Sequence, residues 1–182
     1  MPRQASVNTS VADVIEILSE DHKKVSQLFA EFAKIRHQAD DEAKQTLVEI
    51  TCTELVIHTQ VEEEYLYPAL HEVFDEMDLL DEAEVEHTLA KQLIGELESM
   101  QPDDELYDAK FTVLGEYVKH HIEEEENKIF PKIKNMEMDF KSLGRSIRQR
   151  RDELRSEFGI PDENFDEEEP QQPSTQPHSP HH

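Results

Sequence analysis

The sequence predicts an all-α protein: an up-down-up-down four-helix bundle with an additional C-terminal helix and a disordered tail. Glycine occurs only 4 times in 182 residues and tryptophan is absent, while the helix formers Glu, Leu, Lys and Ala dominate the first 158 positions. Hydrophobic residues make up 36% of the chain, which suits helices with one apolar face better than a sheet buried on both faces. Apolar residues also recur at steps of three and four, the period of an amphipathic helix.

The first predicted helix begins near Asn8–Ser10, where capping residues precede an apolar series. This series is Val14, Leu18, Val25, Phe29 and Phe32, and His22 falls on the same face. The second helix is expected from about Asp41 to Phe74. Its inward face changes from leucine to histidine and glutamate halfway along, with members Leu47, Ile50, Leu55, His58, Val61, Glu62 and Tyr65.

The third helix is expected from Leu80 to about Met100, and its inward face is Ala83, His87, Ala90, Ile94 and Leu97. Pro102 and the following aspartates mark a loop and a new helix start. The fourth helix is expected from about Asp104 to Lys134, with an inward face of Phe111, Leu114, Val118, His121, Glu125 and Ile129. The chain therefore reads as two helical hairpins of similar pattern.

The sequence divides into four parts. Residues 1–9 are expected to be a flexible N-terminus, 10–135 the bundle, 136–159 a basic C-terminal helix and 160–182 a disordered acidic, proline-rich tail. The basic helix, predicted at Phe140–Phe158, has a narrow apolar side. We interpret it as a packing helix whose positive charge offsets the acidic bundle; the alternative is a docking surface for an acidic partner.

Composition limits the function. The formal net charge of −25 argues against general nucleic-acid binding, because phosphates would be repelled. The N-terminus lacks the apolar core of a signal peptide, and no run of about 18 apolar residues suggests a membrane span, so we expect a cytoplasmic protein. The single cysteine, Cys52, excludes an internal disulfide and lies in an apolar-periodic segment, where a small core residue is expected rather than a reactive thiol.

One pattern occurs twice. The segment from His58 to Pro68 reads HTQVEEEYLYP, and the segment from His121 to Pro131 reads HIEEEENKIFP, at an offset of 63 residues. In each, a histidine precedes a glutamate by four residues, which places both side chains on one face of a helix. Upstream of each copy stands an acidic residue followed by a histidine, Asp21-His22 and Glu86-His87.

This pattern predicts a metal site inside the bundle. A carboxylate that faces a core carries a large desolvation cost unless a cation or a proton donor accompanies it. Histidines combined with carboxylates suit first-row transition metals, whereas calcium and magnesium prefer oxygen ligands and structural zinc commonly uses thiolates. The candidate metal ligands are His22, His58, Glu62, His87, His121 and Glu125.

These residues resemble the hemerythrin-like family, specifically the bacterial HHE cation-binding type, over about residues 10–135. The resemblance rests on Asp21-His22, the two repeated segments and Glu86-His87. It implies a four-helix bundle around two iron ions, a non-haem di-iron centre with an oxo or hydroxo bridge. It further implies that the four histidines are terminal ligands and that Glu62 and Glu125 bridge the irons.

The chain departs from the oxygen-carrying hemerythrins, which have a further histidine where this sequence has Lys91. Fewer protein ligands leave more open coordination positions for peroxide or water. His120 could compete with His121, although the internal repeat favours His121. Tyr65 could donate a hydrogen bond to a bound oxygen species, and the direction of Tyr67 is left open. His37 and His71 are assigned to the surface.

The resulting hypothesis is a non-haem di-iron protein that handles oxygen species, either O2 binding and sensing or a response to peroxide or nitric oxide. An enzymatic version would add catalase-like decomposition of peroxide. The alternatives are an iron-binding or homeostasis protein without catalysis and an iron-responsive interaction module. We expect O2, peroxide or NO as the small ligand, with no nucleic-acid or membrane partner; the sequence identifies no protein partner and no catalytic residue.

Overall fold

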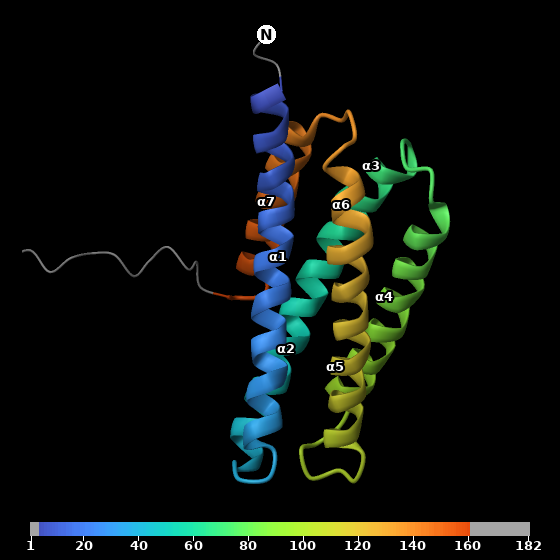
Figure 1. The fold of residues 1–182 in the computed structure, drawn as a ribbon. Coiled ribbons are helices and arrows are strands. Elements are labelled where there is room, and N and C mark those ends of the chain that lie inside the picture. The colour runs from blue at the N-terminus through green and yellow to red at the C-terminus, as the bar shows by residue number, and fades with distance from the viewer. Residues whose placement is uncertain (1–3, 161–182) are drawn as a thin grey trace, which may run out of the picture.

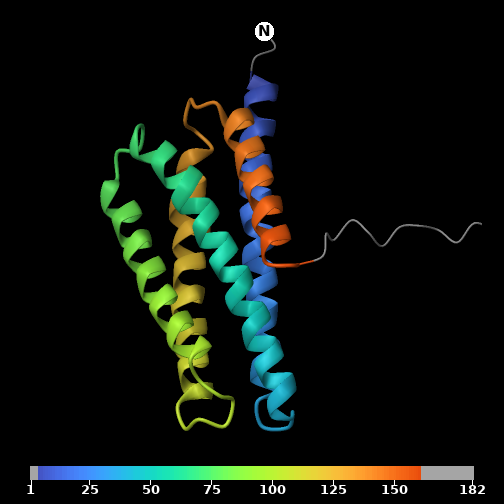
Figure 2. The same ribbon diagram turned by 180° about the vertical axis from the view of Figure 1, so that it is seen from behind.

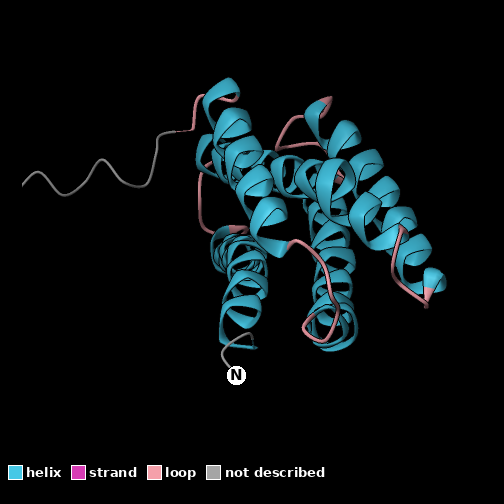
Figure 3. Cartoon of the chain, turned by 90° about the horizontal axis from the view of Figure 1, so that it is seen from above, coloured by secondary structure: helices cyan, strands magenta, loops and turns pink. Residues whose placement is uncertain are grey.

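The computed structural model describes residues 4–160, and their side chains from Ser10 onward. Within this range the chain forms helices joined by short loops, with no strand (Figures 1 and 3). The helices are α1 (Gln4–Ile35), α2 (Asp41–Val61), η1 (Glu62–Leu66), α3 (Tyr67–His71), α4 (Met77–Glu98), α5 (Tyr107–Glu124), η2 (Glu125–Ile129), α6 (Phe130–Ile133) and α7 (Phe140–Glu157). None of these helices combines the length and apolar character needed to cross a membrane. Nearly all of the predicted tail, residues 161–182, lies outside the described residues.

Two antiparallel hairpins form the bundle. Helix α1 packs against α2, and α4 packs against α5, while further contacts join α1 to α5 and α2 to α4 (Figure 1). The short segments η1 and α3 continue α2, and η2 and α6 continue α5. Helix α7 lies outside this group and packs against α1 and α2 (Figure 2). The predicted four-helix bundle with an additional C-terminal helix is confirmed.

The helix bounds differ from the prediction at the N-terminus. Helix α1 begins at Gln4, ahead of the predicted start near Asn8–Ser10. No glycine or proline stands between Gln4 and Ser10, and a helix that has already formed extends at low cost through residues without such breakers. Residues 4–9 therefore belong to α1. At the other end, α7 covers Phe140–Glu157, within one residue of the predicted span.

Two apolar clusters fill the interior, and a polar layer separates them. On α1, Leu18 belongs to one cluster and Val25 to the other, with the buried His22 between them. The other three bundle helices repeat this order, from Leu66 to Leu55 along the second helix for example. Burying polar and charged side chains in a core costs free energy unless their charges are compensated. We therefore expect the functional site in this polar layer.

The single cysteine belongs to the apolar interior. Cys52 is 5% exposed and packs in the cluster that contains Val25 and Leu55. Burial, with a smaller contribution from the negative charge of Glu98, raises the pKa of the Cys52 thiol to about 12. The thiol is therefore protonated at neutral pH, as expected for a core residue.

The basic face of α7 is directed at carboxylates of the bundle. Arg155 Nη1 donates to both carboxylate oxygens of Glu54, at 3.0 and 3.3 Å, and both side chains are buried. Arg151 Nη1 donates to Asp21 Oδ1 at 3.1 Å. These contacts support the interpretation of α7 as a packing helix that offsets negative charge on α1 and α2.

Packing of α7 should contribute measurably to stability. Ile147 is fully buried between α7 and the bundle, so Ile147→Ala is expected to lower the free energy of unfolding by about 2–5 kcal/mol. The exposed neighbour Arg148 is the control, and Arg148→Ala should change it by about 0.5 kcal/mol or less. Urea denaturation followed by circular dichroism measures both. Equal midpoints and slopes for the two variants would contradict a docked α7.

Candidate metal centre

Six polar side chains meet in the layer between the apolar clusters, and they are the six that the repeated sequence pattern singles out. They are His22 on α1, His58 on α2, Glu62 at the start of η1, His87 on α4, His121 on α5 and Glu125 at the start of η2. All six are buried, and the two glutamates are 0% exposed. Each helix of the bundle thus contributes to one small interior region.

Glu62 is shared among histidines of both hairpins. Its Oε1 atom lies 3.2 Å from His58 Nε2, one helical turn earlier in the same hairpin. Its Oε2 atom lies 3.2 Å from His87 Nε2 and 3.8 Å from His121 Nε2, both from the other hairpin. The carboxylate therefore joins the two halves of the internal repeat.

Glu125 occupies the corresponding place in the second half. Its Oε2 atom lies 3.2 Å from His22 Nε2 and 3.6 Å from His121 Nε2. The potential ligand atoms fall into two groups, each with all atoms within 4.8 Å of one another. One group is His22, His58, Glu62 and Glu125, and the other is Glu62, His87 and His121. Two groups that share a carboxylate have the arrangement of a site for two neighbouring cations.

The donor atoms at the centre of the layer lack hydrogen-bonding partners. Among the described residues, no hydrogen bond reaches His22 Nε2, His58 Nε2, Glu62 Oε1 or Glu125 Oε2, although all four atoms are buried. Buried polar atoms in proteins are nearly always hydrogen-bonded, but here each nitrogen faces a carboxylate oxygen at 3.2 Å outside hydrogen-bond geometry, which leaves the four atoms available to a cation. The set contains nitrogen and oxygen donors and no thiolate. It fits a first-row transition metal better than calcium, magnesium or structural zinc.

A carboxylate also stands behind each imidazole, on the Nδ1 side. The Nδ1 atoms lie 2.9 Å from Glu126 for His22, 3.5 Å from Asp21 for His58, 3.0 Å from Glu63 for His87 and 2.9 Å from Glu86 for His121. An Nδ1–H that donates outward leaves Nε2 directed at the centre, which is the usual arrangement of metal-binding histidines. His58 has the longest of these contacts, and its Nδ1 atom makes no hydrogen bond within the described residues, while Asp21 accepts from Arg151.

In the metal-free protein, protons compensate the buried carboxylates. Burial lowers the pKa of His121, but the charge of Glu125 and the contact with Glu62 raise it well above its usual value. The pKa of His22 is raised in the same way, against burial, by contact with Glu125. Burial alone would raise the pKa of Glu62, but the electrostatic influence of the neighbouring His58 and hydrogen bonds from His121 and His87 hold it well below its usual range. A metal that binds here would replace protons.

Both glutamates of the centre begin a π-helical turn, which the sequence did not predict. The backbone N–H of Tyr67 bonds to the Glu62 carbonyl, and that of Phe130 bonds to the Glu125 carbonyl, both in an i→i+5 pattern. Such turns bring the fifth residue after the glutamate back to the same face, and they are frequent at functional sites. Pro68 and its counterpart Pro131 indicate in the sequence that the helix is interrupted, but they do not indicate that the interruption is a π-helical turn.

These turns place an aromatic ring beside the centre in each half. The Tyr67 hydroxyl donates to Glu125 Oε1 at 2.9 Å and lies 3.4 Å from both Glu62 Oε2 and His87 Nε2. At the equivalent position, the Phe130 ring stacks on His22 with centroids 5.8 Å apart. The sequence left the direction of Tyr67 open, and the structure directs its hydroxyl into the centre.

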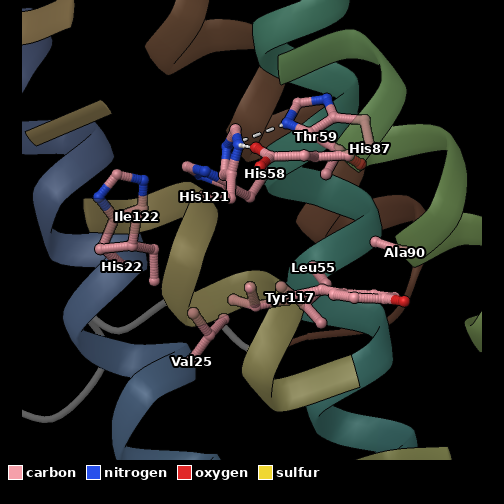
Figure 4. A pocket seen from close by; sticks show the side chains of 12 residues that line it. His22, Val25, Leu55, His58, Thr59, His87, Ala90, Tyr117, His121 and Ile122 are labelled. Atoms are coloured by element: carbon pink, nitrogen blue, oxygen red, sulfur yellow. Dashed lines mark hydrogen bonds and ion pairs between the residues drawn. The ribbon is translucent and has the colours of Figure 1, made fainter. Parts of the chain in front are cut away.

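A small cavity adjoins the four histidines. Figure 4 shows His22, His58, His87 and His121 around it, together with apolar walls that include Val25, Leu55, Ile122 and the ring of Tyr117. Its volume is about 20 Å³. Since one water-sized sphere needs roughly 10–15 Å³, the cavity has room for a molecule of about two heavy atoms.

The remaining candidates lie outside the centre. His120 is 62% exposed, so the structure brings His121 and not His120 into the layer. Lys91 donates to Glu63, the carboxylate behind His87, at 2.6 Å. Tyr65 is half-buried against apolar residues, and His71 is bound to Glu84 near the surface. His37 is exposed.

Known proteins resemble this chain over the region that contains the centre. The sequence profile of the Hemerythrin HHE cation binding domain matches residues 13–133. A curated relative, the "DNA nickase" of Nostoc sp. (strain PCC 7120 / SAG 25.82 / UTEX 2576), is 28% identical over 126 residues, 69% of this chain and 34% of that protein. This chain therefore spans about a third of that relative's length.

A solved structure has the same fold. The crystal structure of a Hemerythrin HHE cation binding domain-containing protein from Mycobacterium kansasii matches with a TM-score of 0.63. The match covers 78% of this chain and 86% of that chain, at 24% sequence identity. The family profile covers most of the described bundle and all six residues of the centre. The chain belongs to the Hemerythrin HHE cation binding domain family.

Proposed function

We propose that this protein is a cytoplasmic non-haem di-iron protein that binds and responds to a small oxygen species, O2, hydrogen peroxide or nitric oxide. One observation carries the proposal: two buried carboxylates are shared among four inward-facing imidazole nitrogens, and four of these potential ligand atoms make no hydrogen bond. Inward carboxylates and histidines of a helix bundle are a recurrent ligand set for paired iron ions. Two irons bound there would supply redox chemistry and coordination positions open to a small ligand.

The protein's own residues support a small ligand. The cavity of about 20 Å³ has room for a diatomic molecule or peroxide. Its apolar walls, among them Val25 and Leu55, disfavour bulk water. These features support O2, peroxide or NO over an organic substrate.

Tyr67 supplies a proton donor. Burial, and next the negative charge of Glu125, raise the pKa of the Tyr67 hydroxyl well above 10, so it stays protonated. The hydroxyl donates to Glu125 and orients that carboxylate between His22 and His121. It is therefore placed to hold Glu125 in position and to provide a hydrogen bond next to the centre.

Iron that remains bound through gel filtration should depend on the buried set alone. Wild-type protein reconstituted with ferrous iron is expected to hold about two equivalents, and His58→Ala or Glu125→Ala about one or fewer, because donors without substitutes are lost. His37→Ala removes an exposed histidine and should leave the iron content unchanged. Iron analysis after gel filtration measures this. Wild-type protein that retains no iron would refute the proposed centre.

Stability should respond to pH in opposite ways with and without metal. The raised pKa values of His22 and His121 mean that the folded state holds protons more tightly than the unfolded state. Their stabilisation is complete below about pH 6.5 and is lost as the pH rises through the folded values. Glu62, with its lowered pKa, adds stability above about pH 4.5 that is lost on acidification.

The melting temperature of the metal-free protein should therefore be highest between about pH 4.5 and pH 6.5 and should fall toward pH 8. In the loaded protein the metal competes with protons, so the stabilisation by metal should grow over the same range. Differential scanning calorimetry at constant ionic strength compares the two. A metal-free melting temperature that rises from pH 6.5 to pH 8 would contradict this charge arrangement.

Tyr67→Phe separates a chemical role from packing. The ring stays in the core and the six ligands remain, so iron content should be unchanged. The reaction of the loaded protein with hydrogen peroxide, followed by its absorption spectrum, should slow by about 10²-fold if the hydroxyl assists proton transfer. Tyr65→Phe is the matched control outside the centre. Wild-type spectra that respond to neither O2, peroxide nor NO would instead favour iron binding without oxygen chemistry.

A further inference from the structure

A second group of metal-binding side chains lies on the exposed side of α4 and α5, outside the centre. It consists of Glu86, His120 and Glu124, and its potential ligand atoms all lie within 4.8 Å of one another. His120 Nε2 is 3.4 Å from Glu86 Oε1 and 4.0 Å from Glu124 Oε2. The imidazole is 62% exposed, whereas both carboxylates are less than a fifth exposed. We refer to these three residues as the outer triad.

Glu86 connects the outer triad to the centre. While its Oε1 atom faces His120, its Oε2 atom accepts a hydrogen bond from His121 Nδ1 at 2.9 Å. Glu86 also lines the small cavity, together with His87 and His121. One carboxylate thus separates an exposed imidazole from the inward-facing ligands.

We infer that the outer triad is a third metal site, at which a divalent first-row ion such as Fe²⁺ binds before it passes into the centre. An imidazole with two carboxylates is a suitable donor set for such ions. Three protein donors leave the remaining positions to water, so the ion stays exchangeable. The role as an entry site rests on the proposed di-iron function, but the binding of metal by the triad does not.

Lys128 competes for this site. Its ammonium group pairs with Oε1 of Glu124, while Oε2 of the same carboxylate is the atom nearest His120. Lys128 is half-exposed and follows Glu124 by one helical turn. A cation at the triad would have to share Glu124 with this ammonium group or displace it. Removal of the lysine charge should therefore strengthen metal binding, an effect opposite to that of losing a ligand.

The chain offers a matched control. His71 Nε2 contacts Glu84 at 3.0 Å, so it too is an accessible imidazole beside a carboxylate of α4. This pair belongs to none of the groups in which three potential ligands converge, and it does not line the cavity. His71→Ala therefore removes a surface histidine of similar chemistry without affecting the outer triad.

The first experiment counts sites. Full-length metal-free protein is titrated with Zn²⁺ by isothermal calorimetry, and each variant carries the same C-terminal histidines. Wild type and His71→Ala should bind one equivalent more than His120→Ala or Glu124→Gln, and Lys128→Gln should bind that equivalent more tightly. Glu86 is left intact because it also holds His121. Equal stoichiometry in wild type and His120→Ala would overturn the outer site.

The second experiment follows entry. Fe²⁺ is added without oxygen, and the rate at which it becomes resistant to the chelator ferrozine reports arrival in the centre. His120→Ala should load more slowly than wild type and His71→Ala yet reach the same final iron content. An unchanged rate would overturn the entry role. Failure of wild-type protein to protect any iron would refute the di-iron function instead, and the Zn²⁺ stoichiometry would still decide the outer site.

Discussion

The structure depends on the burial of two carboxylates among four imidazoles. Glu62 and Glu125 are fully inaccessible, and a single unpaired carboxylate in such a place would cost several kcal/mol. The fold compensates them from both hairpins, because each glutamate contacts histidines from more than one helix. The four helices are thereby held in register around one polar layer, with apolar packing on either side.

Charged side chains surround this layer in successive shells, with carboxylates outside the imidazoles and basic residues outside some of the carboxylates. A carboxylate stands behind each imidazole, and two of the four are in turn paired with cations: Glu63 with Lys91 and Asp21 with Arg151. Arg151 belongs to α7, so the C-terminal helix reaches the centre through only two side chains, Asp21 and His58. A chain with a net charge of −25 thus uses a few well-placed basic residues where negative charge is concentrated.

The sequence predicted the ligand-bearing helices well because its strongest signal is physical. A histidine and a glutamate four residues apart must share a helix face, and a carboxylate on an inward face needs compensation, which identified four of the six residues. His22 and His87 were identified by their place on the apolar faces of the other two helices and by the repeated acidic residue before each. The π-helical turns could not be identified, since an extra residue in a turn is stabilised by tertiary packing and leaves only Pro68 and Pro131 as a trace. The position of the Tyr67 hydroxyl follows from that turn. Each carboxylate behind a histidine lies on another helix than that histidine, so these pairs are formed only when the helices are assembled.

The two halves of the repeat are matched in their ligands but not in their neighbouring rings. Tyr67 and Phe130 occupy equivalent positions after the two π-turns, yet only Tyr67 carries a hydroxyl, and it bonds across to the glutamate of the opposite half. His87 therefore has a hydroxyl beside it, whereas His22 has an apolar ring in the corresponding place. The duplicated framework is thus asymmetric in the rings beside its ligands, and cations bound in the two halves would have different neighbours.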